Sequence, residues 1–276
     1  MIIFAAAIYS ENKRIDITSY DIYDERLPEG FDGARIVQLS DLHNSSFGKH
    51  NVRLISKIKA AEPDYIFITG DYIDSRRTDF KVTDFLSKNI TEIAPVYFCT
   101  GNHERRHSHI LKKLEKSFRK HGIRSLRNSF VYLKRGNSRI RLIGSDDPAF
   151  MKRKLEKEER EQLLSERLGH LCSSQDYNIL LSHKPEYYKV YESSGAELVF
   201  SGHAHGGQFR LPFGIPLYTP DEGFFPIYAQ GVHKIGGMTL VVSRGLGQSV
   251  IPFRINNSPE LVVVTLHCGA ESTKRQ

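Results

Sequence analysis

Residues 35 to 104 contain three apolar runs that end in polar side chains, RIVQLSDLH (35–43), YIFITGDYID (65–74) and PVYFCTGNHE (95–104). Each run has the length and composition of a buried strand. The segments between them, at 51–63 and 79–90, place apolar residues at helical spacing. Three strand–helix units in series predict a parallel or mostly parallel sheet that is covered by helices.

The segments on either side of this region add further strands. Residues 14–23 alternate apolar and polar side chains, and residues 129–147 read as a hairpin with Arg-Gly-Asn-Ser at its turn. More apolar strands are predicted at 177–185, 196–205, 237–245 and 260–267. A charged helix is predicted at 152–168, with an apolar stripe of Leu155, Leu163, Leu164 and Leu168. We therefore expect an α/β fold in which two stacked mixed β-sheets are flanked by helices, which gives four layers.

The chain starts with an apolar run, MIIFAAAIY, before it turns polar at Ser10. A helix that crosses a bilayer needs about 20 apolar residues, so this run is too short to span one. We expect residues 1–13 to be either the remnant of a membrane anchor or a first strand or helix that lies on the domain. No linker interrupts the remainder, so residues 14–270 are predicted to form one domain.

Composition excludes several classes of protein. The 276 residues are 39% hydrophobic and 26% charged, which is typical of a globular protein. The three cysteines are far apart and none forms a CxxC pair, so a disulfide framework and a thiolate metal site are both unsupported. The net charge is +7, and residues 104–127 carry much of the excess. That stretch is either a solvated helix face or a face that attracts phosphates, anionic lipid or nucleic acid, and no nucleic-acid-binding motif accompanies it.

Five polar motifs stand at the ends of predicted strands: DLH (41–43), GD (70–71), GNHE (101–104), SHK (182–184) and GHAH (202–205). In open α/β sheets, ligands bind at the carboxyl ends of strands. The motifs supply oxygen and imidazole groups sufficient for two adjacent divalent metal ions, namely Asp41, His43, Asp71, Asn102, His183, His203 and His205. A glycine precedes Asp71, Asn102 and His203, and we expect these glycines to let the backbone approach the site closely.

The order of these motifs, over residues 36 to about 205, resembles the calcineurin-like metallophosphoesterases. The resemblance implies that Asp41, His43 and His205 bind a first metal and that Asn102, His183 and His203 bind a second. It implies that Asp71 bridges both metals, drawn from Mn²⁺, Fe, Zn²⁺ or Co²⁺. It further implies that a hydroxide bridging the metals attacks phosphorus, while His103 protonates the leaving oxygen as a general acid.

Two further segments bear on the substrate. The loop at 222–233 carries Phe224, Phe225, Ile227 and Tyr228, and these side chains either hold an acyl chain or a base, or pack on one another. Arg244, in the sequence SRGLG, is either a phosphate contact or a member of a salt bridge.

The pattern GHAHGGQ…LP followed by SRGLG resembles a bacterial subgroup of the family, whose members often carry an N-terminal membrane segment or export signal. The subgroup includes phosphodiesterases and an enzyme that cleaves the pyrophosphate of UDP-2,3-diacylglucosamine. The resemblance implies hydrolysis of a phosphodiester or pyrophosphate bond in a small phosphate ester such as a nucleotide-linked lipid, with no specific nucleic acid as partner. It leaves open a membrane-associated or a cytoplasmic location, with a membrane surface as a partner in the first case.

Three other functions fit the same motifs. The site could act as a phosphomonoesterase, or as a nuclease that uses the basic run at 104–127. A scaffold that has lost its activity is the non-enzymatic alternative. A scaffold would lack the bridging aspartate or the general acid, and this chain has both Asp71 and His103.

Overall fold

The computed structural model describes residues 11–151, 154–207, 209–219, 223–248 and 253–270. Within these residues the chain forms two six-stranded mixed sheets and a short two-stranded one. The first sheet has the order β1-β14-β2-β3-β4-β5, with β1 (Asp16–Asp24), β14 (Glu260–Cys268), β2 (Arg35–Leu39), β3 (Tyr65–Thr69), β4 (Val96–Cys99) and β5 (Arg124–Ser125). The second has the order β12-β13-β9-β8-β7-β6, with β12 (Gly231–Ile235), β13 (Met238–Val242), β9 (Leu198–Ser201), β8 (Asn178–Leu181), β7 (Ser138–Gly144) and β6 (Ser129–Arg135).

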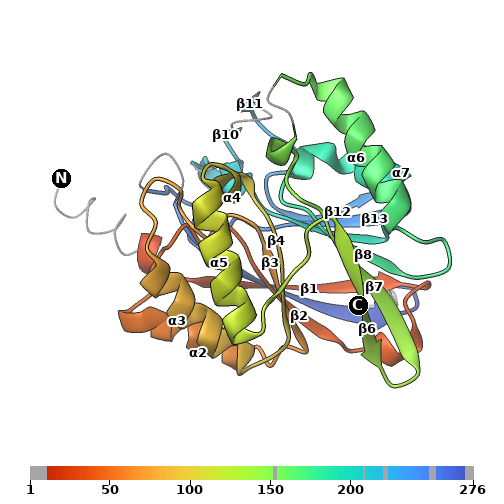
Figure 1. The fold of residues 1–276 in the computed structure, drawn as a ribbon, viewed down its shortest axis with the longest axis horizontal. Helices are drawn as coiled ribbons and strands as arrows, with labels where there is room; N and C mark the ends of the chain where they lie inside the picture. The colour runs from red at the N-terminus through yellow and green to blue at the C-terminus, as the bar shows by residue number, and fades with distance from the viewer. Residues whose placement is uncertain (1–10, 152–153, 208, 220–222, 249–252, 271–276) are drawn as a thin grey trace.

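Helices cover the outer faces of both sheets, as Figure 1 shows. The first sheet packs against α2 (Val52–Ala60), α3 (Phe80–Thr91) and α5 (Ser108–His121). The second packs against α6 (Lys157–Leu171) and α7 (Tyr188–Ser193). The predicted four-layer α/β arrangement of two stacked mixed sheets flanked by helices is therefore confirmed.

The alternation of side chains along β3 shows why a hydrophobic cluster forms on each face of the first sheet. Ile66 and Ile68 point into the cluster beneath the helices, whereas Phe67, between them, points into the cluster between the sheets. The Phe67 ring lies edge-on to the ring of Phe200 in the second sheet, with 5.3 Å between centroids. Because side chains on a strand alternate between faces, a strand that is apolar throughout must be buried on both.

The predicted parallel core is present, since β2, β3 and β4 pair in parallel. The neighbour of β2 on its other side was not predicted. There β14 runs antiparallel to β2 and parallel to β1, which it matches from Asp16↔Glu260 to Asp24↔Cys268. The sequence predicts both strands but contains no local signal that pairs one with the other.

The charged helix is shorter than predicted. The prediction of a start at residue 152 was wrong, because α6 begins at Lys157. The backbone N–H of Glu156 donates to the side chain of Glu159 at 2.9 Å, which is the reciprocal cap that fixes a helix start. Leu164 and Leu168 are buried as expected, whereas Leu163 is exposed. Residues 152 and 153 lie outside the described part of the chain.

Most of the predicted N-terminal segment, residues 1–10, lies outside the described residues. At its end Asn12 is buried and exchanges two hydrogen bonds with the backbone of Arg254. Among the helices that the structure describes, none combines the length and the apolar character needed to cross a bilayer.

Candidate metal centre

The predicted ligands lie where strands of both sheets end. Asp41 and His43 follow β2, and Asp71 follows β3. Asn102 opens the short helix α4 (Asn102–Arg105) after β4. His183 follows β8, and the last two, His203 and His205, follow β9. The carboxyl ends of strands from two sheets therefore converge on one edge of the sandwich.

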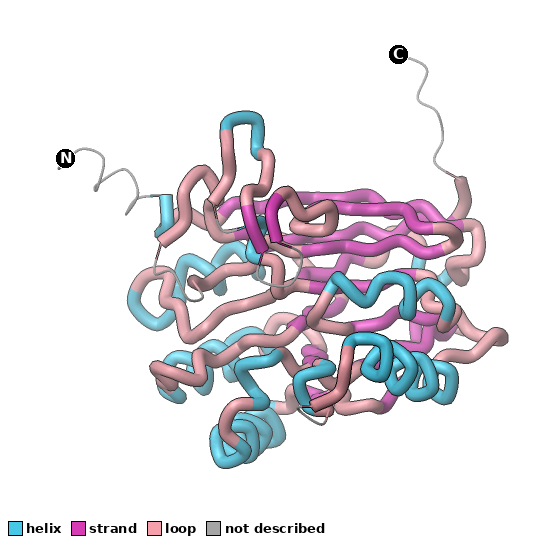
Figure 2. Tube along the Cα trace, turned by 90° about the horizontal axis from the view of Figure 1, so that it is seen from above, coloured by secondary structure: helices cyan, strands magenta, loops and turns pink. Residues whose placement is uncertain are grey.

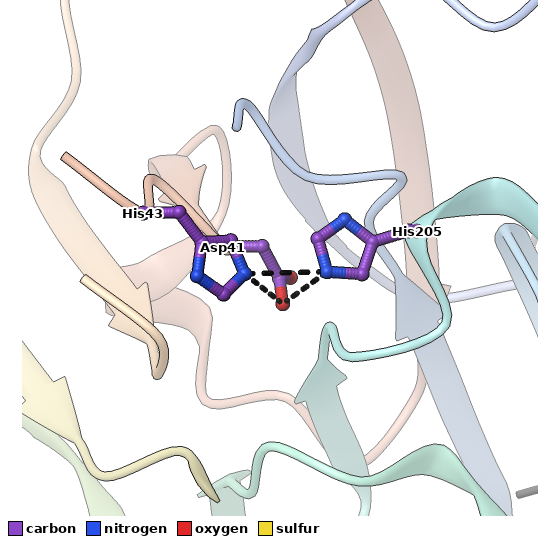
Figure 3. Close-up of side chains that lie close together, drawn as sticks. All are labelled: Asp41, His43 and His205. Atoms are coloured by element: carbon purple, nitrogen blue, oxygen red, sulfur yellow. Dashed lines mark hydrogen bonds and ion pairs between the residues drawn. The ribbon is translucent and has the colours of Figure 1, made fainter. Parts of the chain in front are cut away.

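The first group of side chains consists of Asp41, His43 and His205, drawn in Figure 3. The Nε2 atoms of the two histidines face one another at 3.3 Å. The Oδ1 atom of Asp41 lies 3.4 Å from Nε2 of His205 and 3.9 Å from Nε2 of His43. All three side chains are buried, so their donor atoms are held within reach of a single ion.

The second group consists of Asp71, His183 and His203. Oδ2 of Asp71 lies 3.4 Å from Nε2 of His183, and that nitrogen lies 3.3 Å from Nδ1 of His203. The Nδ1–H of His183 donates to the carbonyl of Thr69 at 2.7 Å. This bond leaves the lone pair on Nε2, which is the tautomer that a metal ligand requires.

Asp71 connects the two groups. Its Oδ2 atom is 3.6 Å from Nε2 of His43 in the first group and 3.4 Å from His183 in the second. The side-chain oxygen of Asn102 is buried and accepts no hydrogen bond from any described residue, although buried polar atoms normally have a partner. A buried set of carboxylate, imidazole and orphaned amide oxygen atoms fits a pair of divalent cations.

The backbone around these side chains adopts a sparsely populated conformation. Five of the seven predicted ligands have positive φ, between 45° and 65°: Asp41, His43, Asp71, His203 and His205. Non-glycine residues rarely adopt this left-handed region, and such residues cluster at functional sites, where the surrounding structure holds them in place. The fold thus fixes the direction of each side chain through its backbone.

The glycines that precede the ligands allow a close approach, as predicted. A Cβ atom on Gly101 would collide with the carboxylate and backbone N–H of Asp71. A Cβ atom on Gly70 would lie 2.6 Å from Nδ1 of His183, and Gly70 also has a φ of 87°. Any side chain at these positions would displace a ligand.

The charges in the cluster depend on one another. Burial opposes ionisation of Asp71 most strongly, but His183, His43 and His103 outweigh it and hold the pKa of this carboxyl well below its usual range. Burial also acts against protonation of His183, yet the carboxylates of Asp71 and Asp41 raise its pKa well above the ordinary value. Burial lowers the pKa of His205, which is thereby neutral as a ligand must be. A divalent cation can take the place of the proton that the carboxylates attract.

His103 lies between the two groups, and neighbouring polar groups fix the orientation of its ring. Its backbone N–H donates to Asp71 at 2.8 Å, and its ring meets that of His43 edge-on. Nδ1 of His103 accepts the backbone N–H of Ser75 at 3.2 Å, so the ring proton is on Nε2. Asp74 lies 3.5 Å from the same Nδ1. Burial lowers the pKa of His103 to about 4, and the nearby Asp71 opposes this shift.

Glu104 joins two of the ligand loops, although no role was predicted for it. Its fully buried carboxyl accepts the backbone N–H groups of Asp71, Ile73 and Gly101, at 2.9, 3.3 and 2.7 Å. Burial, followed by the charge of Asp71, raises its pKa to about 8. The side chain therefore fixes the loop after β3 against the loop after β4.

We expect Glu104→Ala to lower the free energy of unfolding by about 2–5 kcal/mol, because three buried N–H groups lose their acceptor. Glu104→Gln keeps one acceptor oxygen and a similar shape, so we expect it to lose less. Urea denaturation checks both values. Glu62→Ala, at an exposed carboxylate, is the control. Equal stability of Glu104→Ala and the unmodified protein would show that the carboxyl does not hold the loops.

Two arginines complete the surroundings. Arg244 is largely buried, and its guanidinium lies 3.3 Å from Glu260 and 3.7 Å from Asp16. Of its two predicted roles, the salt bridge is therefore present, and the phosphate contact stays a prediction. Arg254 was not predicted. It is fully buried, donates to the carbonyls of Arg244 and Gly247, and lies 3.2 Å from Nδ1 of His205. No local motif marks this residue, because the contact joins side chains 49 residues apart in the sequence.

Comparison with known proteins gives matches over most of the chain. The family described as calcineurin-like phosphoesterase matches residues 34–207. A Bacillus subtilis relative, named uncharacterized metallophosphoesterase YkuE, is 32% identical over 269 residues, which cover 95% of this chain and 89% of that protein. An Escherichia coli relative, named phosphodiesterase YaeI, is 28% identical over 242 residues, covering 84% of this chain and 82% of that protein.

Solved structures share the fold at low sequence identity. The structure of TT1561 from Thermus thermophilus is 12% identical with a TM-score of 0.50, and the match covers 77% of this chain and 90% of that one. The structure of the NAD nucleotidase NadN from Haemophilus influenzae is 15% identical with a TM-score of 0.50, and the match covers 77% of this chain and 50% of that one. At this identity the likeness concerns the layered fold alone.

Proposed function

The chain belongs to the calcineurin-like metallophosphoesterase family, whose members are phosphoric ester hydrolases that typically bind divalent metals, and from this premise we propose that it hydrolyses a phosphodiester or pyrophosphate bond at a two-metal site. The observation that carries the proposal is that Asp71 lies in two possible donor groups, one with His183 and His203 and one with His43 and His103, while His43 also belongs to the group with Asp41 and His205. The relative named as a phosphodiesterase supports the choice of a diester over a monoester.

The proposed ligands follow the two groups. Asp41, His43 and His205 would hold one ion, Asn102, His183 and His203 the other, and Asp71 both. When bound, two divalent ions offset the charge of the phosphate and lower the pKa of water toward ~7, which provides a nucleophile at neutral pH. The pair is drawn from Mn²⁺, Fe, Zn²⁺ or Co²⁺, because the imidazole, carboxylate and amide donors permit all four.

In the proposed step, the protein's own groups orient the ring of His103 so that it can protonate the leaving oxygen. The backbone N–H of Ser75 fixes the proton of His103 on Nε2, the nitrogen that is free to face the substrate. His103 would donate from its imidazolium form, which a bound phosphate and the carboxylate of Asp74, 3.5 Å from Nδ1, both favour, and loss of the Nε2 proton to the leaving oxygen would return the ring to its neutral form. Glu104 holds the loop of Asp71 against the loop that carries this ring, through the backbone N–H groups of Asp71 and Gly101.

We further propose that the substrate is a small phosphate ester such as a nucleotide-linked lipid and that the protein works at a membrane surface. Large apolar side chains are exposed close to the metal centre, in the chain that follows His205. A substrate with an acyl portion would match such surroundings better than a phosphorylated protein or bare nucleic acid.

The proposal is tested by reconstitution with Mn²⁺ and comparison of bis-p-nitrophenyl phosphate with p-nitrophenyl phosphate. We expect kcat/KM for the diester to exceed that for the monoester by about tenfold or more, which is the scale of discrimination that a few contacts provide. A preference for the monoester would identify a phosphomonoesterase instead. Rapid, steeply salt-dependent cleavage of bare DNA would identify a nuclease. Absence of turnover with every divalent metal would identify a scaffold.

A further inference from the structure

Large apolar side chains gather at the surface in one short part of the chain. Of the thirteen large hydrophobic side chains that are exposed within the described structure, seven lie between residues 211 and 227. They are Leu211, Phe213, Ile215, Tyr218, Phe224, Phe225 and Ile227. Residues 209–219 and 223–227 are referred to as the apolar loop. Exposed clusters of this kind mark interaction sites, because isolated domains rarely leave them uncovered.

The apolar loop has a defined shape despite this exposure. The guanidinium of Arg210 donates twice to the carbonyl of Gly214, at 2.9 and 2.6 Å, which closes the turn at Pro212–Gly214. The short strands β10 (Tyr218–Thr219) and β11 (Gly223–Phe224) pair behind it. None of the seven exposed side chains belongs to the three hydrophobic clusters of the described core. The fold therefore holds them outward.

Two of these side chains are presented at a conformational cost. Phe213 is exposed at 102% of its reference area and has a φ of 66°. Phe225 is 61% exposed and has a φ of 56°. Aromatic residues seldom adopt the left-handed region, and where they do the conformation points to function.

The apolar loop is continuous with the metal centre. It follows the turn His205–Gly207, whose first residue is a predicted ligand. A Cβ atom on Gly207 would lie 2.6 Å from Cβ of Pro216, so the loop packs directly on that turn. Figure 2 shows the region standing out from the layered body of the molecule.

The N-terminal part of the chain enters the fold at the base of the same loop. The backbone N–H of Arg210 donates to the carbonyl of Ile255 at 3.1 Å. Two residues further along, the N–H of Asn257 donates to the carboxylate of Glu11 at 2.8 Å. Glu11 directly follows the apolar sequence MIIFAAAIYS. Arg210 and Glu11 are therefore both joined to the short segment 255–257.

Cationic side chains accompany these features at the same edge of the sandwich. The loop after β3 carries Arg76 and Arg77, and the segment after β4 carries Arg105 and Arg106. Three of them, Arg76, Arg77 and Arg106, are exposed. With a net charge of +7, the chain favours an anionic surface over a neutral one, because each cation near such a surface adds about 1 kcal/mol of attraction.

We propose that the apolar loop inserts its side chains into the interface of an anionic phospholipid bilayer and so presents the metal centre to that surface. An anionic bilayer matches the exposed aromatic and aliphatic side chains of the loop and the net positive charge of the chain, whereas a second copy of this positively charged chain would bring like charges together. The inference rests on the proposed function, because docking would give the metal centre access to a lipid-linked phosphate ester. The docking itself requires no turnover.

The absence of tryptophan from the sequence permits a direct test. Phe224→Trp places a single reporter on the apolar loop, and Leu163→Trp places a matched one on α6, where the native side chain is also exposed. We expect vesicles of phosphatidylcholine and phosphatidylglycerol in equal parts to shift the emission of Phe224→Trp to the blue and to leave Leu163→Trp unchanged. No shift for Phe224→Trp, or an equal shift for both, would overturn the proposal.

A second pair of variants separates the loop from the apolar N-terminus. The variant Phe213→Ser/Phe224→Ser/Ile227→Ser should bind these vesicles roughly tenfold or more weakly in co-sedimentation, since interfacial binding scales with buried apolar area. Ile17→Ser/Val52→Ser/Leu163→Ser removes three exposed apolar side chains elsewhere and should bind as the unmodified chain does. Unchanged binding by the loop variant would overturn the proposal, as would a dimer that only the loop variant loses.

Activity in solution distinguishes this proposal from the proposed function. The docking is read from vesicle binding alone, and the proposed function is read from cleavage of soluble bis-p-nitrophenyl phosphate by the unmodified protein. An unmodified protein that binds vesicles but cleaves no phosphate ester would contradict the proposed function and leave the docking surface intact. A protein that cleaves the soluble diester but does not bind vesicles would contradict the docking surface and leave the proposed function intact.

Discussion

An Asp71→Ala protein is expected to bind neither metal ion and to lose turnover by roughly 10³-fold or more, the scale of a lost two-metal transition-state contact. Oδ2 of Asp71 is within 3.6 Å of histidines from both donor groups. Its removal takes one of the two carboxylates among these imidazoles and leaves Asp41 as the only acidic residue of the predicted ligand set. Elemental analysis of the dialysed protein measures the metal content, and bis-p-nitrophenyl phosphate measures the turnover.

Asp71→Asn separates charge from shape in the same experiment. The amide oxygen still accepts the backbone N–H of His103, so the loop keeps its hydrogen bond. We expect metal loss in this variant too, because a neutral amide cannot offset two dications. Asp21→Ala, at an exposed aspartate on β1, is the matched control. Full metal content and activity in Asp71→Ala would refute the two-metal site.

A His103→Ala protein is expected to retain both metals and to lose about 10²–10⁴-fold in kcat, the range for a positioned proton donor. The reason is that the proposed ligand sets do not include its side chain, although His103 forms a third group of possible donor atoms with His43 and Asp71. A bound phosphate places negative charge beside the ring and thereby favours its protonated form. Metal analysis and single-turnover kinetics on a diester separate the two effects.

The leaving group supplies the decisive comparison. A p-nitrophenolate leaves without much help from a proton, whereas an alkoxide does not, so His103→Ala should harm an alkyl diester more than the nitrophenyl diester. His107→Ala, at an exposed histidine beside His109, is the control and should behave as the unmodified protein. Equal losses on both diesters would remove the proton-donor role and leave His103 as a structural residue.

The sequence predicted those parts of the fold that depend on local pattern. The apolar runs that became β2, β3 and β4 are buried on both faces, so their composition alone identified them. The helices α2 and α3 could be located because apolar residues recur in these segments at helical spacing. The candidate ligands could be identified because each lies in a polar motif that directly follows a predicted strand, and the carboxyl ends of parallel strands lie at one edge of a sheet.

Other features of the site depend on contacts that spacing does not reveal. Asp74 and Glu104 stand inside quoted motifs, but their roles need the loops after β3 and β4 to lie side by side. Arg254 reaches His205 across 49 residues of sequence and belongs to no motif. The strand β12 was missed because it follows a segment rich in glycine, proline and aromatic residues, which is more typical of a loop.

The position of β14 governs the order in which the molecule can assemble. This strand forms after every predicted ligand has been synthesised, yet it occupies the place between β1 and β2. Until it is inserted, β2 has an unpaired edge, and the strand that precedes Asp41 and His43 is held from one side only. Contacts between such distant parts of a chain form slowly. The edge of β2 that precedes Asp41 and His43 is therefore completed only by a strand that lies more than 200 residues further along the chain.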